Sequence, residues 1–553
     1  MAKEIAQKQY PPIIVGWHKK LGYLEYRGQQ FVLLAAPTRS SKGVAFVIPN
    51  LLTYPDSMVV LDLKLENFKY TSKFREVHGQ DVFLFAPFVE DGKTHCWNMF
   101  DAVRRRPEHF WVGELISIGE TLYPSDVDPK TKFFNDNARN LFVGLSLYLL
   151  QTPSLPCTGA EIFRQGSGAG KPIKTHIREI LVSRVSDGVD GPALSNECVD
   201  ALNRFLNQPD MTLGNVLSTF NAPLLIFADP IVAAATGKSD FDLENVRKRR
   251  MTVYFGIQPN RLETASLLIN LFFSQLINLN LRELPQNNPD LKYQCVLVDD
   301  EFAAMGRVNV INKSNSYIAG YNLRLLTIIQ AVSQLEDEKL YGIHATRTLV
   351  TNHGLQIMFP PREQKDAEEY SKMLGYFTAI AKGRGRSNGK SSSTSTNLSD
   401  QKRPLMMPQE LREMKTHEQI IILENSKPIR CEKAIYYKDA LFIDRLKALS
   451  PYLAALGKKM PSQVQLEHAA FVLEELSMHI EPLDLAELWA KSALPKPATP
   501  KLRPIRPDEI ATLKTSDLAN YEEMKKCLYQ ILPGFSMVES AMSSISANSI
   551  VAA

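Results

Sequence analysis

A chain of 553 residues is too long for a single hydrophobic core, and its 44% content of hydrophobic residues excludes a largely disordered protein, so we predict at least two packed domains. The formal net charge of +4 excludes nucleic-acid binding through overall charge and leaves any polyanion site to local clusters of Lys and Arg. The six cysteines are scattered without a C-x-x-C pair, which argues against a zinc site or a disulfide framework and fits a reducing cytosol. Apolar stretches such as residues 141–150 fall far short of the roughly 20 residues that span a bilayer, and no signal peptide opens the chain, so we expect a soluble protein.

Two groups of short apolar runs predict the strands of an α/β domain. One group lies between Gln30 and Phe85, and the other begins after Arg250. Continuous apolar runs are typical of parallel strands that are buried on both faces and joined by crossover helices. The runs cover residues 31–35, 58–61, 81–85, 251–255, 295–298, 325–329 and 356–359. We therefore predict one sheet whose two halves are separated in the sequence.

The segment between these halves has helical periodicity instead. Strand-like runs are scarce from Trp97 to Asn245, and residues 137–150 have the apolar spacing of a helix. We predict an all-α domain at 96–245, inserted into a nucleotide-binding domain formed by 1–95 and 246–456. Residues 457–553 are predicted to form a helical C-terminal extension with a proline-spaced linker and a disordered tail. Gly, Ser and Lys dominate residues 382–396, which we predict to be a mobile loop.

The segment after the first apolar run has the context of a phosphate-binding loop. It reads Ala36-Pro-Thr-Arg-Ser-Ser-Lys-Gly43 and lies between a predicted strand and a predicted helix. Backbone N–H groups and the helix N-terminus would surround the β-phosphate, while Lys42 supplies a positive charge. A lysine on a solvated turn is the alternative interpretation of this segment alone. The predicted nucleotide contacts are Pro37, Thr38, Arg39, Ser40, Ser41, Lys42, Gly43 and Val44.

Acidic residues follow the apolar run at 295–298. Carboxylates held close together at a strand end repel each other unless a cation shares them, and Mg²⁺ prefers such oxygen ligands. We predict that Asp300 holds Mg²⁺, directly or through water, and that Glu301 orients and deprotonates the attacking water. A solvated turn is the alternative. Gln330 ends another predicted strand, where it would either sense the γ-phosphate and its water or cap the next helix.

These motifs resemble, in the same order, those of the TraG-like coupling proteins of conjugation and type IV secretion. The resemblance runs from about Gly28 to Asp439. At residues 36–52 the family typically shows a loop of the type G-P-T-R-S-G-K-G followed by V-I-P-N-L-L. Further matching segments are residues 59–66, 94–98, 227–230, 300–302, 318–321, 329–330, 333–335 and 403–405.

The resemblance implies a RecA-like P-loop ATPase that uses ATP and Mg²⁺. It implies a homo-hexamer at the cytoplasmic face of the bacterial inner membrane, which passes DNA–relaxase or effector protein substrates to the channel components of a type IV secretion system. Lys42 matches the phosphate-loop lysine of the family, Asp300 and Glu301 match its acidic strand end, and Gln330 matches its sensor position. Family members usually begin with transmembrane helices, so the resemblance also implies that the membrane segment is absent from this chain.

Three loop positions differ from the general pattern G-x-x-x-x-G-K-[S/T]. Gly43 replaces the hydroxyl residue, and this change is shared with the family. Ala36 and Ser41 replace the two glycines and also depart from the family. Each Cβ costs about 1 kcal/mol if its residue needs a positive φ, so binding is expected while the rate of hydrolysis is left open.

Basic segments at 104–106, 247–250 and 382–390 are candidates for lining a pore that holds single-stranded or double-stranded DNA, and ordinary solvated surface is the alternative. No arginine finger can be selected by spacing, and Arg324, Arg347 and Arg362 are the candidates. Two other functions stay open: a DNA translocase or helicase without a secretion role, and a weakly catalytic adaptor that binds nucleotide to set assembly.

Overall fold

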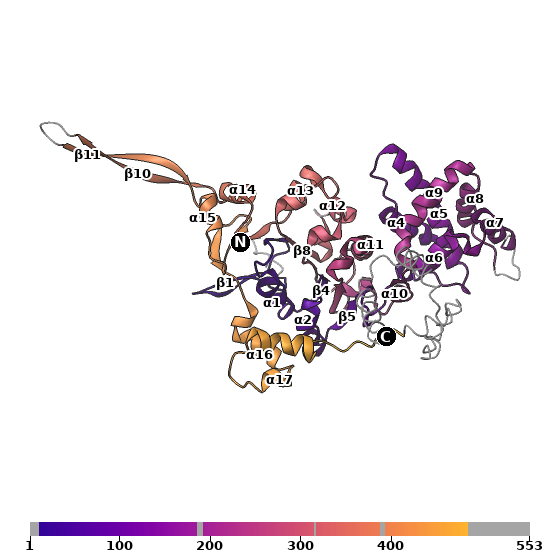
Figure 1. The fold of residues 1–553 in the computed structure, drawn as a ribbon, viewed down its shortest axis with the longest axis horizontal. Helices are drawn as coiled ribbons and strands as arrows, with labels where there is room; N and C mark the ends of the chain where they lie inside the picture. The colour runs from indigo at the N-terminus through magenta and orange to yellow at the C-terminus, as the bar shows by residue number, and fades with distance from the viewer. Residues whose placement is uncertain (1–9, 185–191, 315–316, 388–392, 485–553) are drawn as a thin grey trace, which may run out of the picture. The chain divides into compact units, whose positions relative to one another are not determined.

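The computed structural model describes residues 10–184, 192–314, 317–387 and 393–484, and an eleven-stranded sheet lies at its centre (Figure 1). The strand order is β2-β1-β13-β12-β9-β3-β8-β7-β4-β6-β5. The strands are β1 (Ile13–His18), β2 (Gly22–Tyr26), β3 (Val32–Ala35), β4 (Ser57–Asp62), β5 (Asp81–Phe85), β6 (Met251–Gly256), β7 (Cys295–Asp299), β8 (Leu323–Ile329), β9 (Leu355–Met358), β12 (Glu418–Leu423) and β13 (Ile429–Glu432).

The sheet has a parallel part and an antiparallel part. All neighbours from β9 to β5 in this order pair in parallel, and the predicted apolar runs form these seven strands. The prediction of an α/β fold with one sheet built from two separate stretches of sequence is therefore confirmed. Four further strands, which the sequence analysis did not predict, extend the sheet in antiparallel fashion beyond β9.

Side chains of each central strand alternate between two hydrophobic cores, because successive residues point to opposite faces of a sheet. On β3, Val32 and Leu34 belong to the core that includes Phe46 and Phe68, whereas Leu33 belongs to the opposite core. The first core is covered by η1 (Gly43–Val47), α1 (Ile48–Leu51) and α2 (Glu66–Val77), and the second is covered by α11 (Leu262–Asn280).

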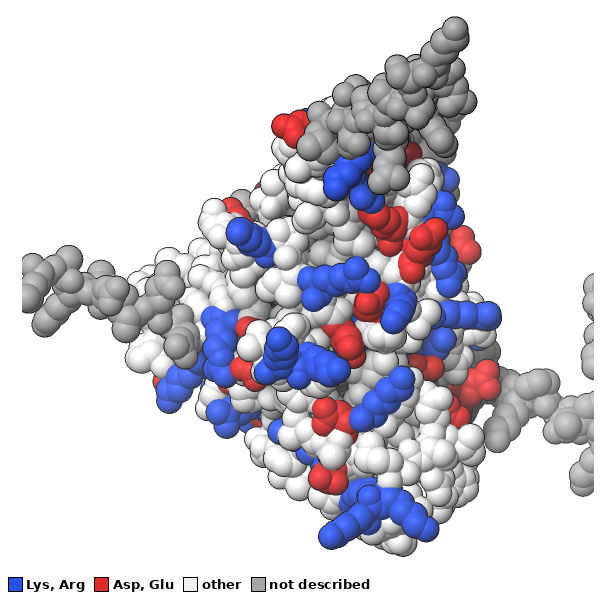
Figure 2. Space-filling model, turned by 90° about the vertical axis from the view of Figure 1, so that its left-hand side faces the viewer, with Lys and Arg blue, Asp and Glu red and all other residues white. Residues whose placement is uncertain are grey.

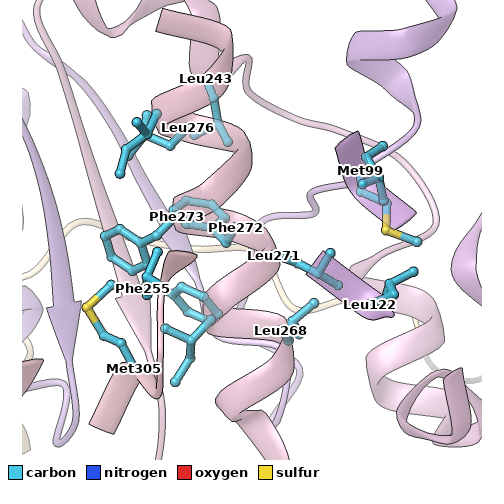
Figure 3. Packing of buried hydrophobic residues seen from close by; sticks show 14 of the residues in the cluster. Met99, Leu122, Leu243, Phe255, Leu268, Leu271, Phe272, Phe273, Leu276 and Met305 are labelled. Atoms are coloured by element: carbon cyan, nitrogen blue, oxygen red, sulfur yellow. The ribbon is translucent and has the colours of Figure 1, made fainter. Parts of the chain in front are cut away.

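Helix α11 packs between the sheet and the helical segment. Figure 3 shows Phe273 directed toward Phe255 of β6, whereas Leu271 is directed toward Leu122 of α4. By length and composition, two stretches of the described residues would be able to cross a membrane, Asp210–Ala228 and Pro259–Asn280, which the sequence analysis did not single out. The second contains α11 and is 61% buried, as expected of a core helix, so it is weak evidence for a membrane span.

Between β5 and β6, the described residues form helices and no strand. The longest is α5, whose N-cap Asp128 accepts hydrogen bonds from the backbone N–H groups of Lys130 and Thr131. It contains the helix predicted at 137–150, which is confirmed. The boundaries 96 and 245 of the all-α domain stay predictions. The helices are α3 (Asp101–Arg104), α4 (Trp111–Leu122), α5 (Pro129–Leu150), α6 (Gly159–Gly166), α7 (Ile173–Ser183), α8 (Asn196–Leu206), α9 (Asp210–Leu224) and α10 (Pro230–Ala235).

The segment predicted to be a mobile loop at 382–396 is a β-hairpin in its described part, so that prediction is wrong there. β10 (Tyr376–Ser387) and β11 (Ser393–Pro404) pair antiparallel with each other and with no other described strand. The composition indicated a loop because Gly and Ser have low strand propensity. The two strands nevertheless form, because pairing satisfies the backbone hydrogen-bonding groups of β10 and β11.

The remaining helices follow β7 or close the described chain. They are α12 (Asn309–Ser314), α13 (Gly342–Thr351), α14 (Gln364–Leu374), α15 (Pro408–Arg412), α16 (Ala440–Lys447), α17 (Pro451–Ala454), α18 (Gln463–Glu467) and η11 (His468–Val472). The predicted C-terminal extension at 457–553 begins with these last two helices, and its part from 485 onward lies outside the described residues.

Candidate functional site

The predicted site residues meet at one edge of the sheet. β3, β8, β7 and β4 are neighbours and run parallel, so their carboxyl ends lie side by side. The phosphate-loop segment follows β3, Asp300 and Glu301 follow β7, and Gln330 follows β8. Parallel pairing thus brings together residues that are nearly 300 positions apart.

Lys42 lies in contact with both acids of the β7 end. Its Nζ donates hydrogen bonds to the Glu301 carboxylate at 2.8 Å and to the backbone carbonyl of Asp300 at 2.5 Å. The same Nζ is 3.5 Å from the Asp300 carboxylate. All three side chains are only 15–22% exposed, so these charges interact through a partly desolvated environment.

The Gln330 side chain is directed at the same carboxylate. Its Nε2 donates to Oε1 of Glu301 at 3.0 Å, while Lys42 occupies the other oxygen of that group. The backbone N–H of Gln330 donates to Oε1 of Gln334 at 3.2 Å. The Gln330 side chain therefore contacts Glu301, and the short helix that follows, η9 (Val332–Gln334), has no side-chain cap.

The backbone of the loop is left-handed at two positions. Arg39 has φ 58° and Ser41 has φ 72°. Ser41 replaces a glycine of the general pattern, so the expected cost of its Cβ, about 1 kcal/mol, applies. Ala36 is not among the described residues with positive φ, and its N–H continues the sheet by donating to the carbonyl of Ile329 at 2.8 Å. Only one of the two replaced glycines therefore strains the loop.

The helix after the loop starts as a π-helix and is fixed by a buried amide. Residues Gly43–Val47 form a π turn, a feature that is frequent at functional sites. The Asn50 side chain donates to the carbonyls of Phe46 and Ile14 at 2.8 and 2.9 Å and accepts from the N–H of Ile14 at 2.8 Å. Strand β1 is thus bonded to the helix that carries the loop.

Asp62 and Asp300 are buried acids at this edge, although the described residues contain no group of three or more side chains that could hold a metal ion by themselves. Burial raises the pKa of Asp62, at the end of β4, to about 7, and the nearby Asp300 adds to the effect. Burial also raises the pKa of Asp300, whereas Lys42 opposes the rise. Within the described residues, Oδ1 of Asp300 is buried and accepts no hydrogen bond, and its charged partner is Nζ of Lys42 at 3.5 Å. A carboxylate oxygen in that position fits a hard cation such as Mg²⁺.

Lys433 touches the phosphate loop, and the sequence analysis missed it. Its Nζ donates to the carbonyl of Ser40 at 3.0 Å and lies 3.7 Å from the centre of the Phe359 ring. The side chain is buried, and this burial lowers the pKa of Lys433 to about 8. No local pattern marks this residue, because the contact joins positions 393 residues apart.

Two basic residues predicted to serve other roles are structural. Arg247 is buried and donates to the Asn280 side chain and to the carbonyls of Glu283 and Tyr321, so its proposed place in a pore is wrong. Arg324 is fully buried and donates to the carbonyl of Gln30, which excludes it as an arginine finger.

The other basic candidates have different surroundings. Arg104, Arg105 and Arg106 each form an ion pair with a nearby acid. Arg347 and Arg362 are exposed. Figure 2 shows Lys and Arg interspersed with Asp and Glu on the face it presents, rather than gathered into one continuous basic patch.

Comparison with known proteins places this geometry in a family. The sequence profile of type IV secretory system conjugative DNA transfer proteins matches residues 1–461. The chain belongs to this family. Proteins similar to it include VirD4 of Agrobacterium fabrum (strain C58 / ATCC 33970), which is 29% identical over 421 residues covering 76% of this chain and 60% of VirD4. TraG of Escherichia coli is 25% identical over 482 residues, covering 81% of this chain and 75% of TraG. The chain therefore spans well under the full length of these relatives.

Solved structures of a plasmid coupling protein, TrwB, share the fold. TrwB in complex with the GTP analogue GDPNP matches with a TM-score of 0.53 at 13% identity, covering 78% of this chain and 96% of TrwB. TrwB in complex with ADP and Mg²⁺ matches with a TM-score of 0.50 at 14% identity, covering 74% and 86%. The RecA-like P-loop fold predicted from the sequence is thus confirmed.

Proposed function

We propose that this chain is the ATP-hydrolysing motor of a type IV secretion or conjugation machine. In this proposal it assembles as a homo-hexamer at the cytoplasmic face of the bacterial inner membrane, recruits DNA–relaxase or effector protein substrates, and drives them toward the channel components. The convergence of Lys42, Asp300, Glu301 and Gln330 at one sheet edge carries the proposal. Complexes of TrwB with ADP and Mg²⁺ and with nucleotide analogues support ATP and Mg²⁺ as cofactors.

Each residue of the site has a chemical task that its position allows. When nucleotide binds, the Lys42 ammonium group leaves the Glu301 carboxylate and contacts the phosphate oxygens instead. The exchange is possible because the carboxylate and the phosphates are both anionic. Asp300 would hold Mg²⁺, which neutralises charge on the phosphates when bound. Once Lys42 leaves, the Glu301 carboxylate is free to accept a proton from the attacking water, and Gln330 keeps that carboxylate in place.

The domain division is part of the same proposal. Residues 1–95 and 246–456 form the motor domain, the all-α domain at 96–245 is inserted into it, and 457–553 extend it. Supporting this division, all described strands of the central sheet lie outside 96–245.

The strain of the loop favours a second candidate function. Positive φ angles at Arg39 and Ser41 make the loop costly to hold without a ligand, as expected of an adaptor that binds nucleotide to set assembly and turns it over slowly.

A translocase without a secretion role predicts equal activity on any DNA in the absence of channel partners.

Turnover measured against protein concentration tests the motor proposal. Transition-state charge on the γ-phosphate usually needs one more cation than Lys42, and a neighbouring subunit is its expected source. Mg-ATP turnover per chain should rise steeply with concentration or with added DNA. Constant specific activity of a proven monomer over a hundredfold dilution would contradict a catalytic oligomer, and turnover near the solvent background under all conditions would favour the adaptor.

A further inference from the structure

A groove of about 580 Å³ runs beside the first turns of the helix that follows the phosphate loop. One wall comes from Val44 and Ile48 of that helix and from Tyr70 of α2. The opposite wall comes from Tyr436 and Tyr437 and from the segment 463–472. Figure 1 shows α1 and α2 near α16, the helix that follows these two tyrosines.

The groove begins where the phosphate end of a bound nucleotide would stop. In P-loop proteins, backbone N–H groups at the start of the helix surround the α- and β-phosphates. Val44 stands at that start, directly after Lys42 and Gly43, and it is also a groove residue. At the same end, Glu66 raises the pKa of Asp300, so the groove edge and the acidic site are electrostatic neighbours. A ribose and base that extend from the loop on the Val44 side would enter this groove.

Aromatic rings give the groove the chemistry of a base site. The Tyr70 ring lies 5.6 Å from the ring of Phe471 and 5.8 Å from that of Tyr436. Phe471 is 41% exposed and its neighbour Val472 is 67% exposed, so this wall presents apolar surface that a flat ligand would cover. Stacking on such rings is available to every nucleobase because each base has a π-face.

The charges on the rim select the base rather than a phosphate. Glu66 and Glu467 line the groove, and neither Lys nor Arg is among its lining residues in the described chain. Carboxylates repel phosphate but accept hydrogen bonds from amino and ring N–H groups, which purine bases offer. His468 adds a further ring on the same wall.

We propose that this groove is the base subsite of the nucleotide site, in which a purine stacks against Phe471 while the rim carboxylates accept hydrogen bonds from it. The inference rests on the proposed nucleotide site at Lys42. Its far wall, 463–472, lies beyond the residues 1–461 that the family profile matches.

Equilibrium binding of the full chain to ATP and to tripolyphosphate, each with Mg²⁺, tests the proposal. Phe471→Ala should weaken ATP binding roughly tenfold, as expected from loss of one stacked base, and leave tripolyphosphate binding unchanged. Phe471→Tyr keeps the ring and should bind ATP as the wild type does. Phe133→Ala, which removes a 49% exposed phenyl ring from α5, is the matched control and should change neither affinity.

The outcomes separate this subsite from the phosphate site. Unchanged ATP affinity in Phe471→Ala, or equal loss for ATP and tripolyphosphate, would overturn the base subsite. Lys42→Ala should weaken both ligands. If both ligands bind Lys42→Ala as tightly as the wild type, the proposed nucleotide site itself fails, whatever Phe471 does.

Discussion

The Lys433 ammonium group donates a 3.0 Å hydrogen bond to the carbonyl of Ser40, in the middle of the phosphate loop. Ser40 lies between the two loop residues with positive φ, Arg39 and Ser41. Lys433 follows β13, on the antiparallel extension of the sheet. The strained loop is therefore held from a part of the sheet that is distant in the sequence.

Replacing Lys433 with Met should loosen the loop while filling the same space. Losing one hydrogen bond to the loop predicts nucleotide binding weakened roughly threefold to tenfold. The pKa of Lys433 in the fold, about 8, is below its ordinary value of 10.5, so between these pH values the unfolded chain binds more protons. Stability of the wild type should therefore rise with pH from about 8 to 10.5, and this rise should shrink in the variant.

Thermal melts at several pH values and nucleotide titrations measure both effects. Lys438→Met is the control, because Lys438 is exposed on the neighbouring turn. A Lys433→Met variant with wild-type nucleotide affinity would show that the contact does not support the loop.

Asp299 should make the protein less stable as pH rises through neutrality. Both of its carboxyl oxygens are buried without a hydrogen-bond partner in the described chain, and burial raises the pKa of Asp299 to about 8 from 3.8. Between pH 3.8 and about 8 the folded chain holds a proton on Asp299 that the unfolded chain lacks. The free energy of unfolding is therefore higher at low pH and decreases as the pH rises toward 8. Asp299→Asn should remove this loss and raise the Tm at pH 8 by about 1 °C for each kcal/mol recovered.

The control for Asp299 is the exposed Asp290, whose change to Asn should leave the pH profile as it is. Equal Tm values for Asp299→Asn and the wild type from pH 5 to pH 8 would mean that Asp299 is paired in solution.

Removing residues 384–396 should leave the Tm within about 1–2 °C of the wild-type value. Among the described strands, β10 and β11 pair only with each other, and changes away from buried contacts have small effects on stability. The deletion removes Arg384, Arg386 and Lys390. If these residues bind DNA, the negative slope of log K against log salt should become shallower by about 2 for single-stranded DNA and by about 3 for duplex DNA.

Changing the same three residues to Gln, with the hairpin length kept, separates charge from length. A salt slope equal to that of the wild type in both variants would remove the hairpin from the DNA-binding surface.

Continuous apolar runs were sufficient to predict the parallel strands, because strands buried on both faces consist mostly of apolar residues. The same pairing rule placed Lys42, Asp300, Glu301 and Gln330 at one edge, and the four do converge. The antiparallel strands could not be predicted in this way, since β13 is partly exposed and one of its two partners, β1, lies far away in the sequence. Arg247 was misread for a related reason: a basic cluster suggests surface, but carbonyl groups from distant loops satisfy this guanidinium in the interior.

Glu301→Gln should separate nucleotide binding from turnover. An amide keeps the shape of the side chain and its contact with Gln330, but it cannot accept a proton from water. Turnover should therefore fall by a factor of about 100 or more, while the Kd for Mg-ATP stays within about threefold of the wild-type value. Titration and steady-state assays of one preparation measure both. Binding lost together with turnover would assign Glu301 to holding the cation or the fold.

The rate of Mg-ATP hydrolysis by Lys42→Ala, compared with the wild type at the same concentration and with DNA present, tests the central claim most directly. Lys42 is the one cation that contacts both Asp300 and Glu301 among the described residues, and its loop has few buried side chains, so the variant should keep the fold. We predict hydrolysis reduced to the solvent background with an unchanged melting profile. Hydrolysis at the wild-type rate by a folded Lys42→Ala protein would contradict the assignment of this sheet edge as the nucleotide site.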